Sequence, residues 1–393
     1  MKLAFWLSLS AVFYTYAGYP LIMFVLSRLS SRPWLRELRV RSVSVIMAVH
    51  NGARSLREQM AHLLSLDPKY VREVIIVSDG SNDGTEEILG GALDARVRPI
   101  ILREQGGKAA ALNHGMAAAS GEILLFIDIR PRVVEGAVAE LVSNFADPKV
   151  GCVAGELLLN TEGHDAASSA VSGVYWKYEQ WIRNCEAAYD SPVGVYGGFY
   201  AIRRELATVF PAGIILDDMF QPLAIVRQGY RNVLDRSACV VDRWPDKVAG
   251  EFQRKVRTLA GNYQLVAQAP WVLGFGNRLW FQLVSHKLMR LVVPYLFVVL
   301  LLTTTWLGVD SVGWRWSAAA QWIFWLAALL ALRMKLPVIH RLAASASALL
   351  VLNVAAVAGL YKFLFTAGPL WKIWSAGKAA DSQVSLTADQ RGA

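Results

Sequence analysis

The chain has 393 residues, 54% of them hydrophobic and 18% charged, and 40 Lys and Arg stand against 31 Asp and Glu. Such an apolar chain can bury enough surface to offset the conformational entropy lost on folding, which excludes a disordered protein. The apolar excess also indicates that lipid solvates part of the chain. The net charge of +9 fits nucleic acid, an anionic membrane face or phosphorylated substrates, and composition leaves these three open. With three cysteines and no C-x-x-C spacing, neither a disulfide framework nor a zinc site is expected.

The first apolar run covers residues 3–26 and contains no charged residue. In a helix that rises 1.5 Å per residue, a run of this length crosses a hydrocarbon layer of ~30 Å. A cleaved signal peptide is the alternative, but its apolar region would be roughly 7–15 residues long. Five arginines follow the run, at positions 28, 32, 36, 39 and 41, which favours a retained anchor followed by a cytoplasmic segment.

Three more apolar runs lie near the C-terminus, over residues 291–309, 318–332 and 342–360. The basic link over 333–341 is expected on the cytoplasmic side, and the short link over 310–315 on the outer side. No run carries a charge near its middle, which argues against a pump or transporter.

Residues 271–290, just before the second run, mix Trp, Phe and Leu with Arg, His and Lys. This pattern predicts a helix that lies in the headgroup layer. The alternative is an amphipathic helix packed on the soluble domain.

The middle of the chain alternates short β-rich runs with helical stretches. Strands are predicted over 43–49, 74–77, 97–102 and 122–127, and helices over 53–66, 85–89, 108–119 and 134–145. Strands that alternate with helices form a parallel sheet with covered faces, and ligands bind at the carboxyl ends of its strands.

Small, acidic and basic residues follow each of these strands. The four clusters are His50-Asn51-Gly52, the run SDGSNDGT over 78–85, Gly106-Gly107-Lys108, and Asp128-Ile129-Arg130. One Gly/Asp cluster alone is more often a turn than a site. Four clusters at successive strand ends indicate a ligand site, and the helix that begins after Gly107 offers backbone N–H groups to a phosphate.

The motifs SVIMAVHNG, VIIVSDGSNDGT, GGKAAALNHGMAAASGEILLFIDIR, GGFYAIRREL and ILDDMF resemble family 2 of the glycosyltransferases. The resemblance covers roughly residues 14–374 and is strongest to membrane-bound bacterial members of exopolysaccharide and cell-envelope pathways. It implies an α/β, Rossmann-like GT-A fold. It also implies a hexosyl-type enzyme that takes a sugar from a nucleotide diphosphate and forms one glycosidic bond with inversion.

The resemblance assigns the donor site. Asp79 matches the acid that reads the donor's base, typically uracil, and Ala48, His50 and Asn51 would line the same nucleoside pocket. Lys108 resembles the family's lysine beside the nucleotide, and its charge suits a diphosphate.

Asp128 matches the first acid of the family's D-x-D motif, which holds Mg²⁺ or Mn²⁺ against the two phosphates. The second acid is replaced by Arg130. One carboxylate can still hold a metal that keeps several waters and binds the phosphates. Alternatively, Arg130 itself neutralises the leaving diphosphate.

Asp217 and Asp218 occupy the place of the family's Glu-Asp pair, at a helix N-terminus near the acceptor. Inversion by direct displacement requires a base opposite the departing phosphate, and Asp218 aligns with that base. Repulsion between the adjacent carboxylates would raise the pKa of one of them. A helix N-cap is the alternative.

The family's Q-x-x-R-W motif is reduced here to Arg254-Lys255-Val256-Arg257-Thr258. Arg254 and Arg257 can share a helix face and clamp the diphosphate. Trp181 or Trp244 could take the place of the missing tryptophan, whose loss argues against processive polymerisation.

The expected organisation is a transmembrane anchor over 1–27, a cytoplasmic GT-A domain over 28–270, an interface helix over 271–290, a region of three membrane helices over 291–375, and a polar tail over 376–393. The expected protein is an enzyme of the bacterial inner membrane that adds a sugar, from a UDP-sugar, to a polyprenyl-linked or saccharide acceptor. A processive polysaccharide synthase and a non-catalytic subunit of an export complex are the alternatives. Nucleic acid is not an expected partner, because the basic residues flank the membrane spans.

Overall fold

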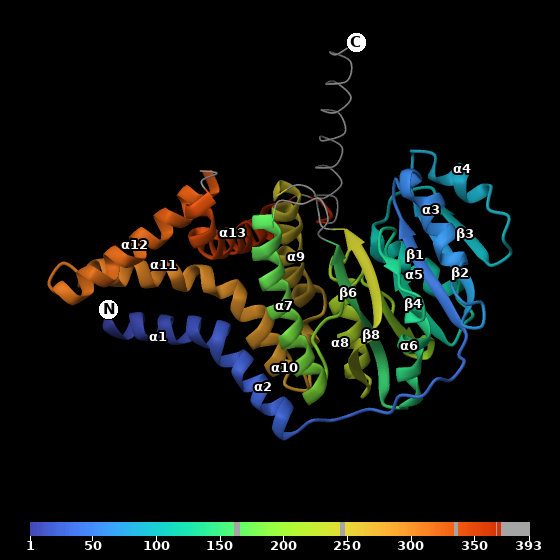
Figure 1. Ribbon diagram of the computed structural model, residues 1–393, viewed down its shortest axis with the longest axis horizontal. Coiled ribbons are helices and arrows are strands. Elements are labelled where there is room, and N and C mark those ends of the chain that lie inside the picture. The colour runs from blue at the N-terminus through green and yellow to red at the C-terminus, as the bar shows by residue number, and fades with distance from the viewer. Residues whose placement is uncertain (161–165, 244–247, 334–336, 367, 371–393) are drawn as a thin grey trace, which may run out of the picture.

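The computed structural model describes residues 1–160, 166–243, 248–333, 337–366 and 368–370. Its centre is an eight-stranded sheet in the order β3-β2-β1-β4-β7-β6-β8-β5 (Figure 1). The strands are β1 Val43–Val49, β2 Val71–Asp79, β3 Val97–Leu102, β4 Ile123–Ile127, β5 Arg132–Val133, β6 Val150–Asn160, β7 Phe199–Arg203 and β8 Arg231–Arg243.

Strands β1 to β4 are parallel, since β1 pairs with β2 and β4, and β2 pairs with β3. They are the four strands predicted from the sequence. Beyond β4 the sheet is mixed, because β7 runs antiparallel to both β4 and β6, whereas β6 and β8 are parallel. The prediction of a parallel sheet is therefore right for the N-terminal half of the domain and incomplete for the rest.

Helices cover both faces of the sheet. The helices of the domain are α3 Ala53–Leu64, α4 Thr85–Gly90, α5 Lys108–Ala118, α6 Ala137–Ser143, α7 Ala166–Tyr189, α8 Asp217–Arg227 and α9 Val248–Gln268. On β1, Val45 and Met47 belong to the core that contains Leu56 of α3, whereas Ile46 belongs to the core that contains Leu112 of α5. A strand covered on both faces reads as a continuous apolar run, which is why the sequence identifies it.

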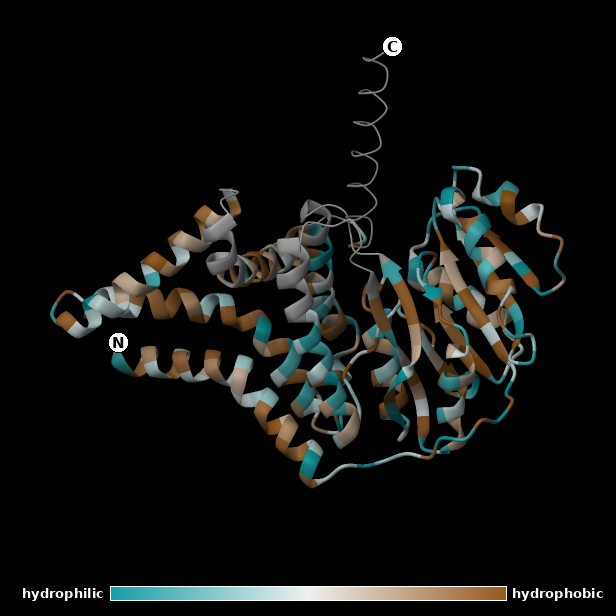
Figure 2. Cartoon of the chain, viewed as in Figure 1, coloured by the Kyte–Doolittle hydropathy of each residue, from teal (hydrophilic) through white to brown (hydrophobic). Residues whose placement is uncertain are grey.

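In the part of the chain that the structure describes, four helices are long and apolar enough to cross a membrane, namely Lys2–Leu29, Trp280–Leu307, Val312–Leu332 and Ala346–Phe365. The helical elements are α1 Lys2–Phe13, a π-helical segment Tyr14–Gly18, α2 Tyr19–Leu29, α10 Trp280–Gln282, a π-helical segment Leu283–Leu288, α11 Met289–Leu307, α12 Val312–Arg333 and α13 Pro337–Phe365. They extend away from the sheet, and Figure 2 shows that hydrophobic residues dominate them. One N-terminal and three C-terminal spans match the prediction.

The segment 271–290 differs from the helix expected there. Pro270–Leu273 is a 3₁₀ turn, and after it Asn277 accepts a backbone hydrogen bond from Trp280, where the next helix begins. That helix runs without a break into α11, so its first part belongs to the second span. Its polar residue His286 is 1% exposed and contacts Glu186 of α7, so this polar side faces protein.

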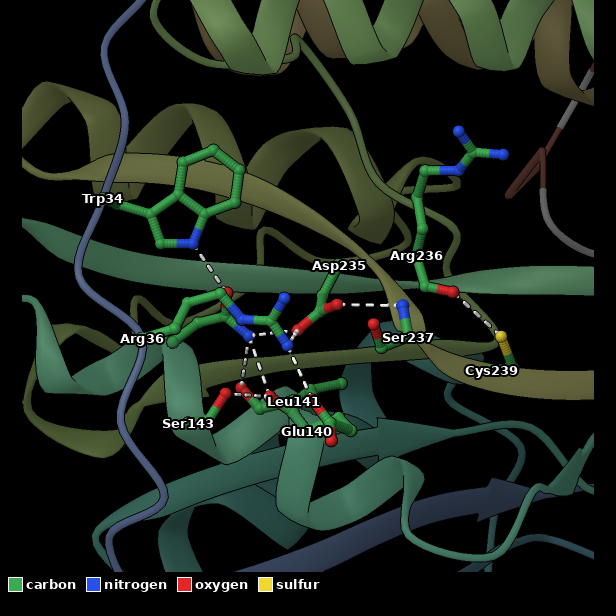
Figure 3. Close-up of polar contacts among 10 residues, drawn as sticks. Trp34, Arg36, Glu140, Leu141, Ser143, Asp235, Arg236, Ser237 and Cys239 are labelled. Atoms are coloured by element: carbon green, nitrogen blue, oxygen red, sulfur yellow. Dashed lines mark hydrogen bonds and ion pairs between the residues drawn. The ribbon is translucent and has the colours of Figure 1, made fainter.

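The segment between α2 and β1 lies along the domain as a strap, here defined as residues 30–42. Figure 3 shows Trp34 and Arg36 of the strap directed at the domain. Trp34 donates to Asn144 at 2.6 Å, and Arg36 pairs with Glu140 at 2.6 Å and with the buried Asp235 at 2.9 Å. Through these contacts the strap connects the first membrane helix to α6 and β8.

Candidate active site

Asp79, the last residue of β2, holds the turn that precedes α5. Its Oδ1 accepts from the backbone N–H of Gly106 at 2.7 Å, and its Oδ2 from that of Gly107 at 2.9 Å. Gly80 has φ +59°, and a Cβ there would lie 2.6 Å from the backbone nitrogen of Gln105, so only glycine fits. The carboxylate of Asp79, which is predicted to bind the donor's base, therefore holds the turn that positions Lys108.

The other three predicted nucleoside contacts lie beside this turn. His50 Nδ1 is 2.7 Å from the carbonyl oxygen of Asp79. Asn51, with φ +51°, accepts from the backbone N–H of Asn82 at 2.9 Å, and Ala48 is half-buried at the end of β1. The structure therefore brings the loops after β1 and β2 together at one edge of the sheet, as the sequence predicts.

Asp83 was not expected to have a role, and it joins the same two loops. It accepts from the backbone N–H of Ala53 at 3.0 Å, where α3 begins, and from Thr85 at 2.5 Å, where α4 begins. These hydrogen bonds lower the pKa of Asp83 although burial alone would raise it. Its place in the SNDGT run is the sequence signal for this role, since Asp before a helix is a common capping residue.

Lys108 connects the two sets of predicted acids. Its Nζ lies 3.0 Å from Asp128 Oδ1 and 3.2 Å from Asp217 Oδ2. Burial alone would lower the pKa of this ammonium, but the two carboxylates outweigh burial and raise it. The lysine is therefore a permanent cation between the ends of β4 and α8.

The Asp217-Asp218 pair opens α8, as predicted. Burial and the negative charge of Asp217 raise the pKa of Asp218 to about 6, while the charge of Lys108 acts in the opposite direction. A carboxyl group with a pKa near neutrality is suited to take a proton from a hydroxyl group. The expected rise in pKa within the pair thus falls on Asp218, and burial is its largest cause.

Two glycines outside the predicted set leave room for Asp218. A Cβ at Gly197 would lie 2.9 Å from the Cβ of Asp218, and one at Gly194 would lie 2.8 Å from Met219. Between them Val195 donates its N–H to the carbonyl oxygen of Asp218 at 2.9 Å. Gly197 is the first residue of the GGFYAIRREL motif, which is the sequence signal for this contact, whereas Gly194 lies outside that motif.

Arg130, in the position of the second D-x-D acid, pairs with Asp242 near the end of β8. Its Nη2 is 3.4 Å from Asp242 Oδ2, and the guanidinium side chain is 59% exposed while the acid is 8% exposed. Within the described residues no group of three His, Cys, Asp or Glu side chains is arranged to hold a metal ion. Asp128 is 45% exposed, so its carboxylate fits a divalent cation whose other ligands are water and phosphate oxygens.

Arg254 and Arg257 lie on α9, and their predicted role at the diphosphate remains a proposal. Further along the same face of α9, Gly261 packs on Leu216, the residue before Asp217. On its other side α9 packs on α13, where the rings of Tyr263 and Phe363 stack at 5.8 Å. Through α9, the last membrane helix contacts the segment that carries the candidate base.

Of the two tryptophans considered as replacements for the lost motif residue, Trp181 lies on α7 and packs on Phe24 of the first membrane span, with ring centroids 6.0 Å apart. It faces the membrane helix and not the carboxylates. Trp244 falls outside the described residues.

Together, the mixed sheet, the acids at the carboxyl ends of its strands and the acidic N-terminus of α8 correspond to a GT-A fold. A mannosyltransferase, PcManGT from Pyrobaculum calidifontis solved with GDP-Man and Mn²⁺, has this fold, with a TM-score of 0.68, 19% identity, and coverage of 92% of this chain and 99% of that one. Residues 44–208 match the family described as glycosyl transferase family 2.

The chain is also similar to curated poly-beta-1,6-N-acetyl-D-glucosamine synthases. It is 23% identical over 248 residues to the protein of Staphylococcus aureus strain COL, an alignment that covers 61% of this chain and 58% of that protein. Its identity to the protein of Staphylococcus epidermidis strain ATCC 35984 is 29% over 260 residues, with 62% and 61% covered. The chain thus spans about three-fifths of the length of these relatives.

Proposed function

We propose that the protein is a membrane-bound inverting glycosyltransferase that transfers a sugar from a nucleotide diphosphate, a UDP-sugar in the first instance, to a saccharide or polyprenyl-linked acceptor. The observation that carries the proposal is the position of Asp218, whose pKa is raised to about 6, on the helix that begins beside Lys108. A carboxyl group of raised pKa beside a cation, at the edge of the sheet where ligands of such folds bind, supports the proposal.

In the proposed reaction Asp218 takes the proton of an acceptor hydroxyl as its oxygen attacks C1 of the donor sugar. The bond from C1 to the phosphate oxygen breaks, and its electron pair leaves with the nucleoside diphosphate. Lys108 stabilises this negative charge, because its ammonium is already held at the site by Asp128 and Asp217. Arg130 lies two residues from Asp128 and is exposed enough to turn from Asp242 to the same charge.

A divalent cation such as Mg²⁺ or Mn²⁺ would be held by Asp128 and would neutralise the two phosphates when bound. Asp79, with His50 and Asn51 near it, would form the floor of the nucleoside site, and Arg254 and Arg257 would approach the diphosphate from α9. The carboxylate of Asp79 has a lone pair on each oxygen beyond its two backbone hydrogen bonds, so it can still accept from a base N–H.

The proposed location is the bacterial inner membrane with the domain on the cytoplasmic side, where nucleotide sugars are available. The arginines that follow the first span support this orientation. Polymer synthesis is the second candidate, and the names of the curated relatives favour it.

The test offers the full chain in lipid nanodiscs a panel of UDP- and GDP-sugars with polyprenyl phosphate and oligosaccharide acceptors, with and without EDTA. Asp218→Asn should lower the transfer rate by about 10²–10⁴-fold. Its matched control is Glu205→Gln, which changes an exposed acid outside the site. Failure of every donor, or a nearly unchanged rate for Asp218→Asn, would contradict the proposal, and product length separates single addition from polymerisation.

A further inference from the structure

The chain that leads to the acid pair crosses the core without forming a helix or a strand. Residues 207–216, here called the lead segment, join the 3₁₀ turn Arg204–Leu206 to α8. The apolar side chains of its second half are 2–6% exposed, namely Phe210, Ile214, Ile215 and Leu216. Buried backbone groups outside regular structure need other partners, so side chains are expected to supply them here.

Gln264 of α9 supplies two of these partners. Its Oε1 accepts from the N–H of Ile215 at 2.9 Å, and its Nε2 donates to the carbonyl oxygen of Gly213 at 2.9 Å. The side chain is 7% exposed, so both bonds are shielded from water. One amide group thus holds the backbone on both sides of Ile214, three residues before Asp217.

The bond to Ile215 lies directly before the point where α8 begins. The carbonyl oxygen of Leu216 accepts from the N–H of Phe220 at 2.9 Å, and this bond belongs to the first turn of the helix. A shift of Ile215 would therefore move the N-terminus of α8 together with Asp217 and Asp218. A displacement of about 1 Å near a reacting group can cost ~10²-fold in rate.

The helix that carries Gln264 is itself held on two faces. Gly261, one turn earlier, lies so close to the lead segment that a Cβ there would be 2.8 Å from Cγ of Leu216. On another face α13 approaches α9, since a Cβ at Gly359 would be 3.0 Å from the backbone nitrogen of Ala260. Figure 1 shows α9 between the membrane helices and the sheet. Gln264 therefore extends from a fixed support.

From these contacts we infer that Gln264 is a positioning residue for Asp217 and Asp218, which acts through the backbone of the lead segment. The inference rests on the proposed function, because it concerns the rate of that reaction. The role of Gln264 is to keep the first turn of α8 at the place where Asp218 meets the acceptor hydroxyl. The last membrane helix supports this role through α9.

Hydrogen exchange tests the positioning first, with the full chain in lipid nanodiscs. Gln264→Leu removes both hydrogen bonds and keeps a side chain of similar size, and the amides of residues 213–220 should exchange about tenfold faster in this variant. Gln268→Leu is the matched control, because Gln268 is exposed and donates to the carbonyl oxygen of Ala212 at 3.1 Å, further from the acids. It should leave exchange at 213–220 unchanged. Equal exchange in Gln264→Leu and the unmodified protein would overturn the inference.

Sugar transfer gives the second readout. In Gln264→Leu we expect kcat to fall about 10–10²-fold while the KM for the donor stays within about threefold. Asn113→Leu removes two comparable hydrogen bonds, which join α5 to the backbone of Phe210 at 3.0 and 2.8 Å, seven residues before Asp217. It should lower the midpoint of thermal unfolding by a similar amount but keep kcat within about threefold. An equal fall in kcat for both variants would show that Gln264 is only a structural residue.

The pH profile separates a displaced base from a smaller folded fraction. Burial is the largest cause of the raised pKa of Asp218, so looser packing of α8 should lower that pKa. The charges that act on Asp218, those of Asp217, Lys108, Arg183 and Lys287, are the same in all these variants. The acid limb of kcat/KM should therefore move to lower pH in Gln264→Leu and stay in place in Asn113→Leu. A limb that does not move in Gln264→Leu would contradict the inference.

A second variant covers the case in which Gln264→Leu does not fold. Gly261→Ala brings a Cβ to 2.8 Å from Leu216, so it should displace the lead segment from α9, lower kcat and move the acid limb in the same direction. Normal kcat and an unmoved limb in this variant would likewise overturn the inference. Absence of turnover with every nucleotide sugar would contradict the proposed function instead, and the exchange measurement would still test the position of the lead segment.

Discussion

Lys108 is the first residue of α5 and Asp217 the first residue of α8, and the ammonium nitrogen of one lies 3.2 Å from the carboxylate oxygen Oδ2 of the other. The N-termini of two helices from different halves of the sheet thus meet through a single ion pair. Asp128, 3.0 Å from the same nitrogen, adds the end of β4 to this contact. A cation at this position holds the two acids together.

Replacing this cation should slow sugar transfer. Lys108→Met leaves the stem of the side chain but removes the charge that stabilises the leaving diphosphate, and we expect kcat to fall by about 10²–10³-fold. Steady-state rates of nucleoside diphosphate release measure the effect. Lys69→Met, at an exposed position outside the site, is the control. A fall of less than about threefold would show that Lys108 does not act on the reacting charge.

The pH dependence should report Asp218. A base works only when it is deprotonated, so kcat/KM should fall tenfold per pH unit below the raised pKa of about 6. The positive charge of Lys108 lowers that pKa, so in Lys108→Met the acid limb should move to higher pH. Rates from pH 4.5 to 8.5 for both proteins check this prediction. If the acid limb has the same pH midpoint in both, the group that titrates is not Asp218.

Restoring the second acid of the metal motif should strengthen metal binding. In Arg130→Asp a carboxylate replaces the guanidinium two residues from Asp128, and we expect the affinity for Mn²⁺ to rise about tenfold. Electron paramagnetic resonance of free Mn²⁺, without nucleotide, measures it independently of activity. Arg72→Asp makes the same charge change at an exposed site and should have no effect. Unchanged affinity would show that Asp128 is not a metal ligand.

A buried ion cluster joins α7 to the second span, and its loss should destabilise the protein. Glu179 lies 2.7 Å from Lys287, 2.6 Å from Arg290 and 3.0 Å from His286. Burial alone would raise the pKa of Glu179, but the charges of Arg290 and Lys287 hold it well below the usual range. Glu179→Gln leaves buried cations without their carboxylate, at a cost of about 3–5 kcal/mol. The midpoint of thermal unfolding in detergent should fall, whereas Glu205→Gln should not change it. Equal midpoints for both variants would contradict this account.

The sequence predicts the elements that depend on local pattern. The apolar runs at Val45 and at residues 291–309 are long and continuous because both faces of β1 and the whole surface of a membrane helix are apolar, and both were predicted. Asp128 was predicted because it follows a recognisable strand, and Asp217 because the ILDDMF motif resembles the family. Their common contact with Lys108 was not.

The features that could not be predicted depend on contacts between distant residues. Asp242 lies 112 positions after Arg130, and nothing in the residues around either one indicates that they pair. The same holds for the segment 271–290, whose polar residues suit a headgroup layer or a protein surface equally well. Only the position of α7 shows that His286 meets Glu186.

The strap after the first span has a consequence for the order of events during synthesis. Arg36 pairs with Glu140 and Asp235, and Arg41 with Glu122, all of them at least 81 positions later in the chain. When the first span leaves the ribosome, these acids have not yet been made, so the arginines carry uncompensated charge at the moment that decides the orientation of the span. Once the domain has folded, the same charges are neutralised and bind the strap to the sheet. The arginines proposed to set the orientation of the first span thus also attach the strap to the folded domain, and their substitution would have separate early and late effects.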